Sequence, residues 1–378
     1  MEYTVWADQT WEKIKKKLNR TVETCGDTCF AYTTKNGRFI ENQSGEGASW
    51  WTNGFWPGIN WLMYLGTKDD RYKKVAQSLE EQLDEPLKRY IGLHHDVGFM
   101  WLLSAVADYR ITGNEQSRIR GWHTANLLAG RYNPAGQFLR AWNDWKDAED
   151  GDRNVGWVII DSMMNIPLLY WASEDLGDPR FKQIAMRHAD TVLAHFIRPD
   201  GSVNHIVGFD PDTGEMLQAY GGQGYGVGSA WTRGQGWAIY GFTLSYIHTG
   251  ETRYLDAAKR VAHFFIANLA EDPVPRADFR APKDPVYYDT TAGALAACGL
   301  IEISRHVDEF ESELYRNAAV RILQAIEERF CDWTENEDSI VQMGSEAYHS
   351  GQNIPIIYAD YYFIEAIQKL RGETTLLW

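Results

Sequence analysis

Apolar and polar positions along the chain predict pairs of helices that differ in character. In each pair the first helix is apolar nearly all round, and a short turn such as "TGETRY" leads into a second helix with charges on one face. A helix that is apolar on every side is buried on every side, whereas an amphipathic helix covers a core. The pattern occurs at residues 59–83, 99–132, 163–196, 238–269 and, more loosely, 294–326.

Two further predicted helices stand outside these hairpins. One is amphipathic and lies near residues 7–22, and the other is apolar and begins at Asp360. If the chain closes into a ring, the first is an outer helix and the last is an inner one, which gives six helices in each layer. We therefore predict an all-α (α/α)6 barrel that forms a single domain over residues 1–378.

The connections between the hairpins are long, while the turns within them are short. The long segments cover about residues 25–50, 84–94, 133–159, 197–233, 271–289 and 331–357. Long loops in a compact domain usually carry function. All of them lead into the N-terminal ends of inner helices, where free N–H groups and the helix dipole favour an anion. We expect the binding site at this mouth of the barrel, and a ligand that bears a carboxylate.

Composition excludes several classes of protein. No apolar run approaches the roughly 18 residues of a membrane helix, and the N-terminal segment has charges and Trp where a secretory signal would be apolar. We expect a cytoplasmic protein without a membrane partner. The net charge of −15 disfavours nucleic acid as a partner and favours small substrates. The Cys residues, including Cys25 and Cys29, lack a zinc-type pattern and fit free thiols. Several Trp residues lie in loops, where they can stack on sugar rings or cover helix ends.

Candidate chemistry gathers at the starts of the inner helices and in the loops before them. The set comprises Trp51, Trp56, His94, His95, Asp96, Trp142, Asp161, His205, Gln223, Trp231, Arg233, Trp237, Asp289, Tyr348, His349 and Asp360. Asp96 and Asp161 open neighbouring inner helices, so their carboxyl groups can form an acid–base pair. The apolar setting "WVIIDSMMNIPLL" should raise the pKa of Asp161 and keep a proton available near neutral pH. The alternative is that each Asp only caps its helix.

Three other features leave alternatives open. His94, His95, His205 and His349 can bind a metal, hydrogen-bond to substrate or have a purely structural role. Because "HHD" does not place two ligands on one helical face, we expect no metal, and we expect no cofactor. The stretch "FDPDTGE" has part of the pattern of a calcium loop but lacks the later acidic ligand, which favours a turn between short strands. Arg233 can pair with a carboxylate in a bidentate manner or hold a loop in place.

The chain resembles the unsaturated glucuronyl hydrolases, glycoside hydrolase family 88. The resemblance lies in "WWTNGFWPG", "HHDVGF", "RAWND", "IIDSMMNIPLLYWA", "GFDPDTG", "WTRGQGWAIYGF", "YYDTTAGALAACGLIEI" and "ADYYFIEA". These motifs extend from Trp50 to about Ala366, in the order and spacing of the family. The resemblance implies an (α/α)6 barrel, in agreement with the helix pattern.

The resemblance also implies a reaction. Substrates are oligosaccharides left by polysaccharide lyases, with a C4=C5 double bond in the uronic acid at the non-reducing end. An acid protonates C4, activated water adds at C5, and the resulting hemiketal opens. By motif position, Asp161 is the general acid and base, and Asp96 is its carboxylate partner. The implied binding residues are His205, Gln223, Trp231, Arg233 and Trp237, with Trp51, His95 and Trp142 as further pocket residues, and we add Tyr348 and His349 from the mouth.

The chain departs from the family pattern at three positions. Trp157 stands four residues before Asp161, where relatives carry Arg. Gln352 and Ala347 stand where some members that take sulfated fragments have Lys and Ser. We therefore expect unsulfated disaccharides as substrates. Separately, we expect the enzyme to be a monomer or homodimer.

Alternatives of other classes remain. A hydrolase of unsaturated galacturonyl–rhamnose from pectin uses the same barrel, and so does a sugar epimerase, which would leave glycosidic bonds intact. A sugar-binding protein without catalysis is a third alternative, since a fold alone does not define a function.

Overall fold

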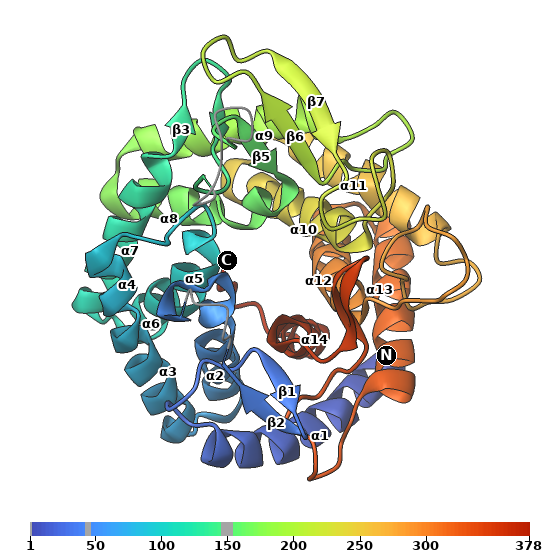
Figure 1. Ribbon diagram of the computed structural model, residues 1–378. Coiled ribbons are helices and arrows are strands. Elements are labelled where there is room, and N and C mark those ends of the chain that lie inside the picture. Colours follow the sequence, from blue (N-terminus) through green and yellow to red (C-terminus); the bar gives the residue numbers. More distant parts are fainter. Residues whose placement is uncertain (1, 42–46, 145–153) are drawn as a thin grey trace.

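Two concentric layers of helices form a ring in the computed structural model, which describes residues 2–41, 47–144 and 154–378 (Figure 1). The inner layer consists of α2 (Phe55–Thr67), α5 with η3 and α6 (Val97–Trp101, Leu102–Val106, Ala107–Thr112), η5 with α8 (Ile160–Met164, Pro167–Leu176), α10 (Thr232–Thr249), α12 (Thr290–His306) and α14 (Ile357–Leu370). The outer layer consists of α1 (Glu2–Thr24), α3 with α4 (Asp70–Gln82, Asp84–Arg89), α7 (Glu115–Ala129), α9 (Pro179–Phe196), α11 (Thr252–Ala267) and α13 (Glu309–Phe330).

The ring closes through contacts between consecutive inner segments. α10 packs on α12, α12 on α14, and α14 on α2, which in turn contacts η3, while α5 and α10 both contact α8. Among the outer helices, α1 packs against α14 and α3, and so joins the two ends of the chain. The predicted (α/α)6 barrel is confirmed. The last inner helix begins at Ile357, about one turn before the predicted start at Asp360.

Two inner segments start irregularly at the mouth. The second begins with a five-residue α-helix, passes through the π-helix η3, and continues as α6. The third begins with the 3-10 turn η5 before α8. These two starts approach each other closely at Gly98, where an added Cβ would lie 2.4 Å from the Cα of Asn165. The glycine thus permits the contact that brings the two predicted acidic residues onto adjoining elements.

Short strands occupy the long loops. β1 (Thr33–Lys35) pairs with β2 (Arg38–Ile40), β3 (Tyr132–Asn133) with β4 (Phe138–Leu139), and β8 (Gly344–Ala347) with β9 (Ser350–Ile354). β5 (Trp157–Ile159), β6 (Ile206–Phe209) and β7 (Met216–Tyr220) form an antiparallel sheet.

The "FDPDTGE" stretch is the turn between β6 and β7. Asp210 Oδ1 accepts from the backbone N–H groups of Asp212 (2.9 Å) and Thr213 (2.8 Å), so this carboxylate is used within the turn. The prediction of a turn is confirmed.

The end of the barrel opposite the loops is filled by aromatic side chains around Trp378, whose chain end lies in the centre of the ring (Figure 1). The Trp378 ring stacks on Tyr362 at 5.9 Å and meets Phe99 edge-on at the same centroid distance. Its indole N–H donates to Glu365, and Arg110 donates to its backbone carbonyl. The barrel therefore has a packed floor.

Two smaller findings bear on the class of protein. Cys25, Cys29, Cys298 and Cys331 are free thiols. Within the described ranges, the helices contain none that combines the length and the apolar character needed to cross a membrane.

Candidate active site

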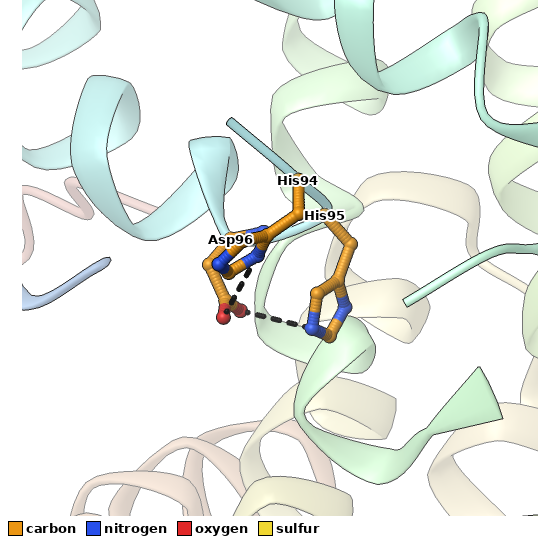
Figure 2. A group of neighbouring side chains, drawn as sticks. All are labelled: His94, His95 and Asp96. Carbon is orange, nitrogen blue, oxygen red and sulfur yellow. Dashed lines mark hydrogen bonds and ion pairs between the residues drawn. The ribbon is translucent and has the colours of Figure 1, made fainter. Parts of the chain in front are cut away.

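Asp96 lies at the start of the second inner segment, directly before α5. Its side chain makes no capping hydrogen bond to the helix, so the cap alternative does not hold for this residue. Its carboxylate instead faces His94 Nδ1 at 3.5 Å and His95 Nε2 at 3.3 Å (Figure 2). Burial lowers the pKa of His94 to about 3 and that of His95 well below its usual value, so both rings are neutral.

Asp161 lies in the first turn of η5, beside the mouth. Burial raises the pKa of its carboxyl to about 7, and the charge of Arg233 and the side chain of Trp237 offset only part of this effect. The expected shift of the Asp161 pKa therefore appears in the structure, for the physical reason that the apolar sequence around it suggested. A carboxyl with a pKa near 7 can both donate and accept a proton near neutral pH.

His205 is a titratable neighbour of Asp161. Its Nε2 lies 3.8 Å from Asp161 Oδ1, and its Nδ1 accepts the backbone N–H of Gln223 at 2.9 Å. Burial lowers the pKa of His205 to about 3, so the ring is neutral. Because Nδ1 is an acceptor, the single proton of the neutral ring sits on Nε2 and points toward Asp161.

Asn165 joins the two acidic residues and is not among the residues predicted from the sequence. Its Nδ2 donates to Asp96 Oδ1 at 2.9 Å and to the backbone carbonyl of Asp161 at 3.2 Å. Its Oδ1 accepts the backbone N–H of Phe99 at 2.8 Å. The signal that could have revealed it is the spacing of four residues after Asp161, which puts both on one side of a helical turn.

Arg233, in the first turn of α10, anchors the loop that carries β8. Its guanidinium pairs with Asp289 at 3.2 Å and donates to the backbone carbonyls of Ser345 and Glu346 in β8. Asp289 in turn caps α12 by accepting from the N–H of Ala292. Of the two alternatives for Arg233, the structure thus realises the one in which it anchors a loop, and pairing with a substrate carboxylate stays a prediction.

Aromatic rings line the site from several elements. Trp51, in the 3-10 turn η2 (Trp51–Gly54), packs 5.2 Å from Phe99, and Trp237 packs 5.1 Å from the same ring. Trp231, directly before α10, lies 4.3 Å from the His205 ring. Trp142 lies apart from these, beside the β5–β6–β7 sheet, 6.4 Å from Trp157.

The loops before α10 and α14 contribute the remaining predicted residues. Gln223 accepts the Tyr348 N–H at 2.8 Å and donates to the Glu346 carbonyl at 2.6 Å. Tyr348 packs against Tyr225, whose carbonyl oxygen lies 2.9 Å from His349 Nε2. His349 is exposed at the rim, so these side chains form the outer part of the mouth.

Two members of the predicted set have structural roles. The Trp56 side chain is buried and donates its indole N–H to the Gly26 carbonyl at 2.9 Å, which ties the first loop to α2. Asp360 accepts the backbone N–H groups of Ile340 and Val341 and so anchors the last loop. Both side chains are buried, and a partner in another segment of the chain engages each one.

A cation site is geometrically conceivable at His94, His95 and Asp96, whose ligand atoms lie within 4.8 Å of one another. The His94 and His95 nitrogens, however, already lie 3.5 Å and 3.3 Å from the Asp96 carboxylate oxygens (Figure 2). Asp96 is further engaged by Asn165. The expectation that the enzyme uses no metal stays a prediction.

Several buried polar atoms around the mouth have no hydrogen-bond partner among the described residues. They are His95 Nδ1, Asp161 Oδ1, His205 Nε2, Trp231 Nε1 and Trp237 Nε1. Buried polar atoms in native proteins are normally paired, so a group of unpaired ones indicates where a polar ligand binds. Donors from His and Trp beside a protonated acid suit the hydroxyl and carboxylate oxygens of a sugar acid.

Comparisons with known proteins define the class to which this barrel belongs, the glycoside hydrolases. The model of Glycosyl Hydrolase Family 88 matches residues 25–271. The chain is 35% identical over 368 residues to an unsaturated glucuronyl hydrolase of Bacillus sp. (strain GL1), covering 95% of each. It is 33% identical to an unsaturated chondroitin disaccharide hydrolase of Streptococcus pneumoniae, covering 87% of this chain and 83% of the relative.

A solved structure agrees with these matches. The crystal structure of unsaturated glucuronyl hydrolase from Streptococcus agalactiae superposes with a TM-score of 0.90 at 30% identity, covering 99% of this chain and 94% of that one. The chain belongs to Glycosyl Hydrolase Family 88.

Proposed function

We propose that this hydrolase releases a 4,5-unsaturated uronic acid from the non-reducing end of oligosaccharides made by polysaccharide lyases. The observation that carries the proposal is the buried Asp161 carboxyl with a pKa of about 7, whose Oδ1 has no hydrogen-bond partner among the described residues. Protonation of an enol ether needs an acid that still holds its proton near neutral pH. The names of the Bacillus and pneumococcal relatives agree with such a substrate.

The proposed reaction begins with transfer of the Asp161 proton to C4 of the double bond. Positive charge then develops at C5 and on the ring oxygen. Asp161, now a carboxylate, accepts a proton from water as the water oxygen bonds to C5. The product is a hemiketal, whose opening breaks the ring and releases the next sugar.

The neighbouring side chains have defined parts in this proposal. His205 donates from Nε2 toward Asp161 or the substrate, and its neutral state keeps it from competing as an acid. Asp96 supplies a negative charge that stabilises the cationic transition state. Trp231 and Trp237 offer unpaired indole N–H groups to substrate oxygens. The anionic uronate fits the N-terminal ends of the surrounding inner helices.

For the sugar that precedes the uronate, we propose an unsulfated residue. Trp157 and Tyr220 form an aromatic pair with centroids 4.5 Å apart on the sheet beside Asp161, and Trp142 adjoins it. Aromatic faces suit the apolar face of a neutral sugar. Gln352 donates to the Tyr348 carbonyl at 2.7 Å and carries no charge for a sulfate.

The test is a panel of unsaturated disaccharides followed by loss of their ultraviolet absorbance. We expect turnover of unsaturated glucuronyl disaccharides, faster without sulfate than with it. Turnover restricted to unsaturated galacturonyl–rhamnose would favour the pectin alternative. Conversion of a free saturated sugar with every glycosidic bond intact would favour an epimerase.

The location and assembly of the protein stay proposals from the sequence. We propose a cytoplasmic, single-domain enzyme that is a monomer or homodimer. Cell fractionation tests the first point, limited proteolysis the second, and light scattering after size-exclusion chromatography the third.

A further inference from the structure

The side-chain amide of Asn165 is saturated with contacts to both acidic elements. Its two N–H groups reach Asp96 Oδ1 at 2.9 Å and the Asp161 carbonyl at 3.2 Å, and its oxygen accepts the Phe99 N–H at 2.8 Å. The residue is fully buried. If the amide were inverted, its oxygen would face a carboxylate and a carbonyl, which are both acceptors. The orientation is therefore fixed.

The two acidic residues receive different support from this amide. The carboxylate of Asp96 accepts a hydrogen bond, and such a bond favours the charged form of the acid. Asp161 is held only through its backbone carbonyl, so its carboxyl gains no such stabilisation from Asn165. A single side chain thus favours charge on one acid and fixes the position of the other.

Other charged or titratable groups also face the pair. Around Asp96, the groups within the described ranges include the neutral rings of His94 and His95 and, at longer range, the cation of Arg131. Around Asp161 they are His205, Arg233, Tyr358 and Tyr362. Arg131 and Arg233 each favour the charged form of the acid nearer to it, so the cations act on both acids. The donated hydrogen bond of Asn165 acts on Asp96 alone.

We propose that Asn165 is a positioning residue that keeps the proton of the acid pair on Asp161, by stabilising the ionised Asp96 and by holding the turn that carries Asp161. This inference rests on the proposed function, since it assigns the proton needed at C4. Asn165 does not touch substrate itself.

The test uses Asn165→Ala and Asn165→Ser in the full chain, with Asn60→Ala as the matched control. Asn60 is also a fully buried Asn of an inner helix, but its amide donates to the Trp56 carbonyl, and no hydrogen bond joins it to an acidic residue in the described part of the chain. The pH dependence of kcat/KM on an unsaturated disaccharide is measured for each variant, together with KM and the thermal unfolding midpoint.

The expected result is a fall of kcat by about 10- to 100-fold with KM changed less than about threefold. The acidic limb of the profile, set by protonation of Asp96, should move up by about one pH unit. Asn60→Ala should keep the wild-type profile even where its unfolding midpoint falls. A wild-type acidic limb in both Asn165 variants would overturn the inference. If wild type were inactive on every unsaturated disaccharide, the proposed function itself would fail, so the two failures are distinguishable.

Discussion

His205 Nε2 lies 3.8 Å from Asp161 Oδ1, and neither atom has a hydrogen-bond partner among the described residues. The gap is too long for a direct hydrogen bond and short enough for one oxygen atom to contact both groups. It marks the place where a proton can leave Asp161 while the neutral imidazole holds a substrate or water oxygen.

Asp161→Asn should lower kcat by about 1,000-fold or more while substrate still binds. The amide has nearly the same shape but cannot donate the proton that the double bond needs. Loss of ultraviolet absorbance measures turnover, and quenching of Trp fluorescence measures binding. Near wild-type turnover in this variant would exclude Asp161 as the acid.

The pH dependence of kcat/KM should show a basic limb near pH 7. The active form holds a proton on Asp161, whose pKa is raised to about 7 by burial, so activity falls as pH rises through this value. His205 should not contribute, because burial lowers its pKa to about 3. Rates are measured between pH 5 and 9 with unfolding followed at each pH. A profile that rises through pH 7 would contradict the assignment.

Asp161→Asn should also change how stability depends on pH. The folded pKa of Asp161, about 7, lies above the ordinary value of 3.8. Between these values the folded chain binds more protons than the unfolded chain, so the Asp161 contribution to stability falls as pH rises from about 4 to about 7. The amide has no such dependence. Thermal unfolding should show that the free energy of unfolding of the variant rises relative to that of wild type across this pH window, by a few kcal/mol at most.

That comparison is internally controlled. Asp360 and Glu80 also have pKa values raised to about 7 by burial, but both are present in wild type and variant and cancel in the difference. A difference in unfolding midpoint that stays constant from pH 4 to pH 8 would show that Asp161 does not titrate abnormally.

Arg233→Met should destabilise the fold by about 3–5 kcal/mol, because it leaves Asp289 buried without its cation. The same change frees β8 from the guanidinium. Chemical denaturation measures the loss. The double variant Arg233→Met with Asp289→Asn should recover part of it, since no unpaired charge remains. Equal losses in the single and double variants would show that the ion pair is not the cause.

Gly98→Ala should lower both the stability and the activity of the enzyme. Its Cβ would lie 2.4 Å from the Asn165 Cα and 2.6 Å from the Asn165 carbonyl oxygen, which forces α5 and η5 apart. Alanine normally stabilises a helix relative to glycine by about 1 kcal/mol, so a net loss reports the clash. Gly226→Ala is the control, because nothing lies within 4 Å of its added Cβ. Equal behaviour of the two variants would contradict the close approach.

The ring was predictable because its signal is local and repeated. The inner helix α10 is buried along almost its whole length, and the sequence carries this directly as small and apolar residues on every side. The position of Asp96 and Asp161 at the mouth followed from the same assignment of inner and outer helices. The raised pKa of Asp161 followed from its apolar neighbours.

Other features depend on contacts that the sequence does not encode locally. The π-helix at Leu102–Val106 arises in a segment of ordinary helix formers. Asp360 was predicted to begin a helix. Its carboxylate instead accepts the backbone N–H groups of Val341 and Ile340, which lie nineteen and twenty residues earlier in the chain. In the sequence Asn165 is a single polar residue in an apolar segment. Its role becomes visible only from its contact with α5, where it accepts the Phe99 N–H.

The packed floor around Trp378 has a consequence for the way in which long oligosaccharides bind. With Tyr362 and Phe99 against the indole, the barrel is blind at one end, and no polymer can thread through it. A sugar chain can enter only by its tip, and the released monosaccharide must leave through the opening by which it came. Each encounter therefore removes one terminal unit, and the shortened oligosaccharide, which no longer has an unsaturated tip, is not a further substrate.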